Sequence, residues 1–167
     1  SKLCRSYSDR SILEKVRNAV LEVKNGNASF ERDSVLFYKP DYNWPFLSEV
    51  LWAFGKSNGK LTIVDFGGSL GSTYFQHRRW LDDLKYTWNV VEQPHFVEEG
   101  KKYFEDEKLR FFNTVEEIKK KGPSFLVLSS VLAYLSDPYT WLTRLLDLKY
   151  DYIFIDRTPL VEGNDRL

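Results

Sequence analysis

The sequence is poor in the residues that carry disulfide, metal and redox chemistry. It has one cysteine, Cys4, no methionine and two histidines among 167 residues. A single thiol excludes an intrachain disulfide and a cysteine-based zinc site. No cluster of other metal ligands stands out along the chain, so we expect no bound metal. Low cysteine use fits a reducing compartment, and we expect a cytoplasmic location.

The chain also lacks an excess of charge of either sign and any long apolar run. It carries 24 Lys and Arg against 24 Asp and Glu, so its formal net charge is zero. This balance argues against nucleic acid as a partner, because binding to a phosphate backbone depends on basic surface. No apolar stretch is long enough to cross a bilayer, and the first residues do not have the form of a targeting peptide. We therefore expect no membrane insertion.

Aromatic residues, in contrast, are plentiful, at 16% of the chain. The interpretation that we prefer is a core and a pocket built from Phe, Tyr and Trp side chains. A surface that stacks on sugar rings is the alternative that the composition leaves open.

The order of apolar runs predicts an α/β fold. Short apolar runs alternate with segments in which apolar side chains recur every three or four residues. We expect strands at 61–66, 86–92, 109–112, 124–129 and 152–156, and helices at 11–23, 46–54, 72–84, 94–104, 114–120 and from Asp137 onward. Such repeats favour parallel strands with helices on both faces of the sheet.

The prediction is therefore a single domain over 1–167. Its core, 59–167, is a Rossmann-like, doubly wound and mostly parallel sheet. The segment 1–58 forms an N-terminal helical cap with an irregular aromatic stretch at 34–45. In such sheets ligands bind outside the carboxyl ends of the strands, so we look for function there.

A glycine-rich segment follows the first predicted strand of the core. It reads Asp65-Phe66-Gly67-Gly68-Ser69-Leu70-Gly71. Glycines allow a tight turn, and the helix that follows presents free backbone N–H groups to a ligand. The spacing is not the G-x-G-x-x-G of dinucleotide-binding enzymes, because Ser69 and Ser72 stand at the second and third glycine positions.

The next predicted strand ends in an acid, Glu92, about one strand–helix–strand unit beyond the glycines. A carboxylate at this place can accept hydrogen bonds from both hydroxyls of a ribose. Glu92 therefore indicates nucleoside binding in general, with a solvated strand-end acid as the alternative.

These segments resemble motif I and its neighbours in class I S-adenosylmethionine-dependent methyltransferases. Motif I is written D/E-x-G-x-G-x-G, and this chain departs from it with Ser69 at the middle glycine. The likeness continues through Val90-Val91-Glu92-Gln93-Pro94, the run from Leu128 to Leu135, and Ile155-Asp156-Arg157-Thr158-Pro159. In this order they are similar to a family of bacterial methyltransferases associated with surface-polysaccharide biosynthesis, whose substrate is not established.

The likeness covers about 42–160 and implies S-adenosylmethionine as the cofactor. It assigns Gly67, Gly68 and Gly71 to the methionine part of the cofactor. Asp65 would hold the turn and the cofactor's ammonium group. Members of the family are longer at the C-terminus, which implies that the last strands of the sheet, an antiparallel hairpin, lie outside this chain.

Further strand ends receive roles from the same resemblance. Asn113 and Thr114 stand where such enzymes contact adenine, although Thr114 is equally well explained as a helix cap. Ser129 and Ser130 stand where the fourth strand meets cofactor and acceptor, with a plain turn as the alternative.

A hydroxyl acceptor would need a general base. By residue type, Asp156, Tyr134 and His77 are the candidates, and His95 is a further one. Each histidine can also be a surface or capping residue, and the Asp156-Arg157 pair can be a strand-end ion pair of small energetic consequence. No catalytic base is assigned from the sequence.

The function predicted from these features is methyl transfer from S-adenosylmethionine to a small molecule or glycan precursor. Two alternatives remain open, a non-catalytic domain with the same fold and an NAD(P)-dependent oxidoreductase. The sequence predicts neither the atom that is methylated nor the oligomeric state.

Overall fold

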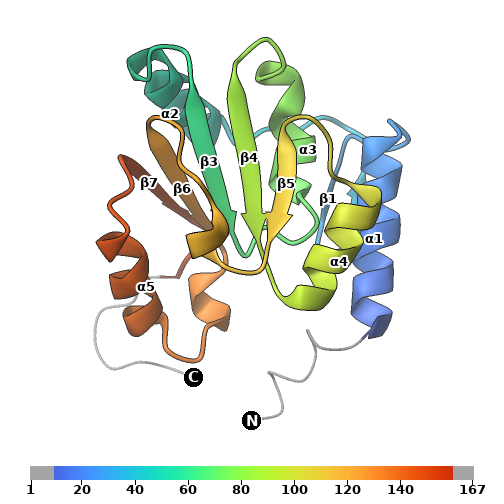
Figure 1. Ribbon diagram of the computed structural model, residues 1–167. Coiled ribbons are helices and arrows are strands. Elements are labelled where there is room, and N and C mark those ends of the chain that lie inside the picture. Colours follow the sequence, from blue (N-terminus) through green and yellow to red (C-terminus); the bar gives the residue numbers. More distant parts are fainter. Residues whose placement is uncertain (1–9, 160–167) are drawn as a thin grey trace.

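The computed structural model describes residues 10–159, and its centre is a five-stranded sheet (Figure 1). The strands are β3 (Leu61–Phe66), β4 (Tyr86–Val91), β5 (Leu109–Phe112), β6 (Ser124–Ser129) and β7 (Tyr152–Asp156). Their order is β5-β4-β3-β6-β7, and every neighbouring pair is parallel. The chain builds outward from β3 to β5 and then returns to the other side of β3, so strand order reverses between β3 and β6. The predicted α/β fold with a parallel sheet is confirmed.

Helices cover both faces of this sheet. On one face lie α1 (Arg10–Lys24), α2 (Trp44–Lys56), α3 (Ser72–His77) and α4 (Pro94–Tyr103). On the other lie the 3-10 turns η3 (Val115–Glu117) and η4 (Leu132–Tyr134) and helix α5 (Pro138–Asp147). Because both faces are covered, all six residues of β3 are buried. Within residues 10–159, no helix combines the length and the apolar character that crossing a bilayer requires.

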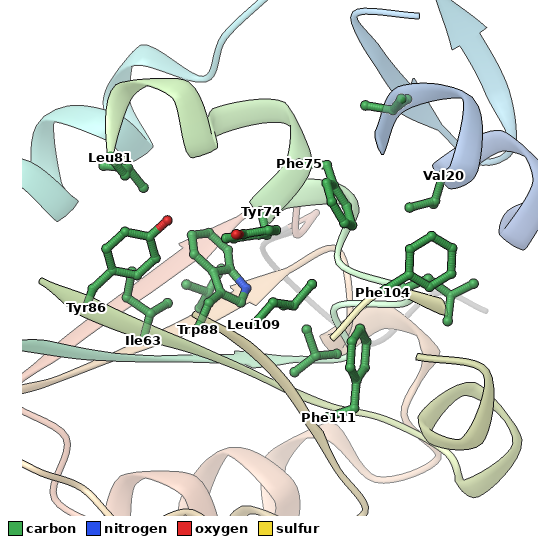
Figure 2. Close-up of a cluster of buried hydrophobic side chains, with 14 of the residues drawn as sticks. Val20, Ile63, Tyr74, Phe75, Leu81, Tyr86, Trp88, Phe104, Leu109 and Phe111 are labelled. Carbon is green, nitrogen blue, oxygen red and sulfur yellow. The ribbon is translucent and has the colours of Figure 1, made fainter. Parts of the chain in front are cut away.

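The core under α1 to α4 is strongly aromatic. Trp88 of β4 is fully buried, and its ring centroid lies 5.7 Å from that of Tyr74 and 5.9 Å from that of Phe46. Figure 2 shows Trp88 and Tyr74 inside this cluster of side chains. Much of the high aromatic content is therefore used in packing, as the preferred interpretation expects, while Trp44 and Trp80 are exposed at the surface.

A hairpin lies between α1 and α2 in the N-terminal segment. Its strands are β1 (Phe30–Arg32) and β2 (Val35–Phe37), and its turn residues Asp33 and Ser34 have φ of 52° and 67°. The prediction of an irregular segment over 34–45 is wrong for 35–37, which form β2, and for 44–45, which begin α2. The turn lacks the Asn-Gly or Asp-Gly pair that marks such hairpins in a sequence. Phe30 and Phe37 instead join the strands by stacking across them, with ring centroids 4.5 Å apart.

Two predicted helices are shorter than expected. The helix predicted over 72–84 ends as α3 at His77 and continues as a 3-10 turn, η2 (Arg78–Trp80). This tighter turn brings Leu81 into full burial. The helix predicted over 114–120 is reduced to η3, because Val115 and Ile118 are both buried and their three-residue spacing matches the 3-10 repeat.

Candidate functional site

The loop from β3 to α3 turns through backbone conformations that favour glycine. Gly67 and Gly71 have φ of 75° and 87°. A Cβ at Gly67 would lie 2.4 Å from Val131 Cγ2, and a Cβ at Gly68 would lie 2.5 Å from Asp65 Cγ. The loop packs so closely on the side chains of Val131 and Asp65 that both positions require glycine.

Ser69 stands where motif I has its middle glycine, and its φ is 54°. Left-handed backbone costs a non-glycine residue about 1–2 kcal/mol. Ser69 thus adopts the left-handed backbone conformation that a glycine would have at this position, and this conformation costs energy.

Asp65 lies beneath this loop, near the end of β3. Its side chain is almost fully buried, and Trp88 Nε1 donates a hydrogen bond to Oδ2 at 3.1 Å. Burial raises the pKa of Asp65 to about 7, the Trp88 hydrogen bond opposes that rise, and the charge of Glu92 adds to it. With Gly68 packed directly on the carboxyl, Asp65 is placed to brace the loop.

Glu92 joins the loops that follow two adjacent strands. Ser69 N–H donates to Oε1 at 3.2 Å, and Gln93 N–H donates to Oε2 at 2.8 Å. Burial raises the pKa of Glu92, and the two backbone hydrogen bonds lower it. The carboxylate is therefore fixed in orientation beside the glycine loop.

Asn113 and Thr114 follow β5 and are both exposed. Thr114 precedes η3, and its N–H donates to Glu117 Oε1 at 3.0 Å. This bond is one half of a capping box with Glu117, so Thr114 caps the turn, as the helix-cap alternative expects.

The ends of β6 and β7 are tied to each other. Ser130 has φ of 63°, and its N–H donates to the Asp156 carbonyl at 2.9 Å. Ser129 Oγ accepts from Arg157 Nε at 3.1 Å and from Nη2 at 2.9 Å. Both serines and the Asp156-Arg157 pair thus lie at one place on the carboxyl edge of the sheet.

Asp156 receives hydrogen bonds on both carboxylate oxygens. Asn43 Nδ2 donates to Oδ2 at 2.7 Å, and Arg157 N–H donates to Oδ1 at 2.8 Å. Arg157 Nε also lies 3.9 Å from Oδ2. Asn43, from the N-terminal segment, therefore orients a candidate base at the far end of the chain.

His77 is buried, and both of its ring nitrogens are engaged. Nδ1 lies 2.8 Å from the Thr73 carbonyl, and Nε2 lies 3.1 Å from Asn43 N. A carbonyl only accepts and a backbone N–H only donates, so Nδ1 carries the proton and Nε2 accepts. Burial lowers the pKa of His77, which favours this neutral form. These two hydrogen bonds link α3 to Asn43, and His77 also lines the polar pocket at the ends of β6 and β7.

The other two base candidates lie in different surroundings. Tyr134, at the end of η4, is 63% exposed. His95 lies in the first turn of α4, with its ring centroid 5.0 Å from that of Phe96. Neither residue lines the polar pocket at the ends of β6 and β7.

This polar pocket has a volume of about 210 Å³. Its walls come from the β1–β2 hairpin, from α3, from the segment before α2, and from the ends of β6 and β7. The sequence prediction missed six of its residues: Arg32, Asp41, Tyr42, Asn43, Thr73 and Gln76. A local pattern marks Asn43, because Asn followed by proline in a first helical turn indicates an N-cap, and Asn43 Oδ1 does accept from Phe46 N–H. No local pattern marks the other five.

Comparison with known proteins adds no further constraint. The chain matches no known protein-family model and no curated protein. Across residues 10–159, no three His, Cys, Asp or Glu side chains come together as a metal site would need.

Proposed function

We propose that the chain is a class I S-adenosylmethionine-dependent methyltransferase domain that acts on a small molecule or glycan precursor. The observation that carries the proposal is the hydrogen bond from Ser69 N–H to Glu92 Oε1. It sets an acid beside a left-handed glycine loop, at the carboxyl ends of two adjacent strands. A cofactor that joins an amino acid to a nucleoside needs both features. The glycine loop would hold the amino acid, and the carboxylate would bind the ribose of the nucleoside.

The donors and acceptors at this edge suit that cofactor. Each carboxylate oxygen can accept two hydrogen bonds, and each oxygen of Glu92 takes one from the backbone. Glu92 thus keeps acceptor capacity for the two ribose hydroxyls. Asn113 and Thr114 follow β5, the neighbour of β4, so adenine would extend toward them. The loop at 67–71, on the other side of Glu92, would hold the methionine part.

The polar pocket lies where we assign the methyl acceptor, beside the ends of β6 and β7. When bound, the cofactor supplies an electrophilic methyl group on a sulfonium. Asp156 is the residue that we assign as general base, because its two hydrogen bonds hold the carboxylate and leave it able to accept from a substrate hydroxyl. Asp156 would take the hydroxyl proton as the acceptor oxygen bonds to the methyl carbon, and the electron pair of the broken carbon–sulfur bond would stay on sulfur as a neutral thioether. Holding the acceptor in line for this step can supply much of the rate enhancement.

Isothermal titration with S-adenosylhomocysteine tests the cofactor assignment. We expect the chain to bind it and not NAD. Glu92→Gln should weaken binding about tenfold or more, since hydrogen bonds to a charged group contribute about 1.5–3 kcal/mol. Glu98→Gln is the matched control, because Glu98 is an exposed acid on α4. Its affinity should not change.

Three results would contradict the proposal: no binding by a chain shown to be folded, equal effects of the two glutamine variants, or a preference for NAD. A preference for NAD would favour the oxidoreductase alternative. A non-catalytic domain would bind S-adenosylhomocysteine and transfer no methyl group. Turnover with an acceptor separates that alternative from the enzyme.

A further inference from the structure

Arg32 reaches the polar pocket from the hairpin without an acidic partner. In the described part of the chain, no carboxylate oxygen lies within 4.0 Å of its side-chain nitrogens. Its neighbour Glu31 is buried, and Glu31 Oε2 accepts from Ser34 N–H at 2.9 Å. The Arg32 guanidinium carbon lies 5.7 Å from the ring centroid of Phe30, which stacks on Phe37. A guanidinium held over a ring in this way is prepared to bind two oxygens of one anionic group.

Arg157 enters the same pocket from the end of β7. Its Nε and Nη2 both donate to Ser129 Oγ, and its Nη1 donates to no atom of the described residues. The φ of Arg157 is 48°, a conformation that costs a non-glycine residue energy and that persists where the surrounding structure enforces it. The side chain lies against Ser129, and the guanidinium edge that carries Nη1 remains available at the pocket.

Acidic and neutral side chains complete the pocket walls. Two acids, Asp41 and Asp156, line the pocket together with Thr73 and Gln76. The Gln76 amide Nε2 donates to the Asp41 carbonyl at 2.7 Å, which leaves its oxygen as an acceptor. The pocket therefore offers arginine donors for an anion together with acceptors for hydroxyl groups. A volume of about 210 Å³ limits the ligand to a small molecule or to one end of a larger one.

We propose that this pocket binds an acceptor that carries both a hydroxyl and an anionic group, either a carboxylate or a phosphate. Arg32 and Arg157 hold the anionic group, and Asp156 receives the hydroxyl. The inference rests on the proposed function for the reaction that it serves, whereas the binding itself requires only the pocket. It narrows the acceptor from any small molecule to hydroxylated acids and sugar phosphates.

Saturation-transfer NMR on the whole chain tests the pocket, with D-glucuronate as the anionic probe and D-glucose as its neutral counterpart. We expect glucuronate to bind about tenfold or more tightly than glucose, from the charged hydrogen bonds that glucose cannot make. Arg32→Gln and Arg157→Gln should each weaken glucuronate binding about tenfold. Arg110→Gln, an exposed arginine on β5, is the control and should bind like the unchanged chain.

Inorganic phosphate, added as a competitor, distinguishes the two anionic groups. Displacement of glucuronate at a lower concentration than glucuronate's own dissociation constant supports a phosphorylated acceptor, and weaker displacement supports a carboxylate. Equal affinity for glucose and glucuronate would overturn the proposal, as would an unchanged affinity in Arg32→Gln.

Titration of the same samples with S-adenosylhomocysteine separates the two proposals. A chain that binds the nucleoside but shows no Arg32-dependent anion binding contradicts the pocket alone. A chain that binds glucuronate through Arg32 but no S-adenosylhomocysteine keeps the anion pocket and contradicts the methyltransferase proposal.

Discussion

Ser69 donates its backbone N–H to Glu92 Oε1 at 3.2 Å, and it does so from a left-handed backbone with φ of 54°. The contact joins the loop after β3 to the end of β4. Because a serine keeps a conformation that suits glycine, the loop stores energy at this position. The contact needs only the backbone of residue 69, so it survives a change of side chain.

Ser69→Gly should therefore stabilise the chain. We expect the free energy of unfolding to rise by up to about 1 kcal/mol, since glycine relieves the left-handed strain but adds entropy to the unfolded state. Urea unfolding measures the change. Ser48→Gly in α2 is the control and should lower stability by about 0.5–1 kcal/mol, because Ser48 is in an ordinary helix. The same sign in both variants would contradict the strain at Ser69.

Gly68→Ala should destabilise the chain through Asp65. The added Cβ would lie 2.5 Å from Asp65 Cγ, and the buried carboxyl is held by Trp88. We expect a loss of about 2 kcal/mol, typical of overpacking in a core. Gly55→Ala, where a Cβ meets nothing within 4 Å in α2, should gain up to about 1 kcal/mol. Equal unfolding midpoints for the two variants would argue against a loop packed on Asp65.

Asp65 should make the chain less stable as pH rises from about 4 to about 7. Its folded pKa is raised to about 7 by burial, so over this range the folded chain holds a proton that the unfolded chain has released. The penalty is absent below the unfolded pKa and complete above pH 7, at no more than about 4 kcal/mol.

Urea unfolding at pH 5 and pH 8 checks this dependence. Asp65→Asn keeps an oxygen for the Trp88 hydrogen bond and removes the titration, so its loss of stability between the two pH values should be smaller. Asp83→Asn, at an exposed acid, should lose as much as the unchanged chain. If Asp65→Asn loses as much stability between the two pH values as the unchanged chain does, then ionising the Asp65 carboxyl costs the folded chain no stability.

His77 should remain neutral at pH 7, with the proton on Nδ1. Burial lowers its pKa, and Thr73 and Asn43 fix the tautomer. A lowered folded pKa means that the unfolded chain takes up a proton first, so this histidine costs stability as pH falls below about 6.5. Two-bond ¹H–¹⁵N correlation spectra report the tautomer directly. A protonated ring or an Nε2–H tautomer at pH 7 would contradict the hydrogen bonds to Thr73 and Asn43.

Much of the fold could be predicted because its determinants are local. Each strand of the sheet is a short apolar run, and its length and boundaries follow from the few residues inside it. Helix starts at Asp137 and at Pro94 are also local, since a cap or a proline acts within one turn. The helices predicted over 72–84 and 114–120 came out shorter because burial of Leu81 and Ile118 depends on distant packing.

The sequence by itself determined the parallel α/β core, the glycine loop between β3 and α3, and the acids at the strand ends. These are properties of neighbouring residues, set by backbone sterics and apolar periodicity. Only the tertiary structure decided that His77 accepts from Asn43, that Asn43 orients Asp156, and that Arg32 and Arg157 share a pocket. Such contacts join residues more than 30 positions apart in the sequence. They depend on how side chains pack in the folded chain, and no local sequence pattern encodes that packing.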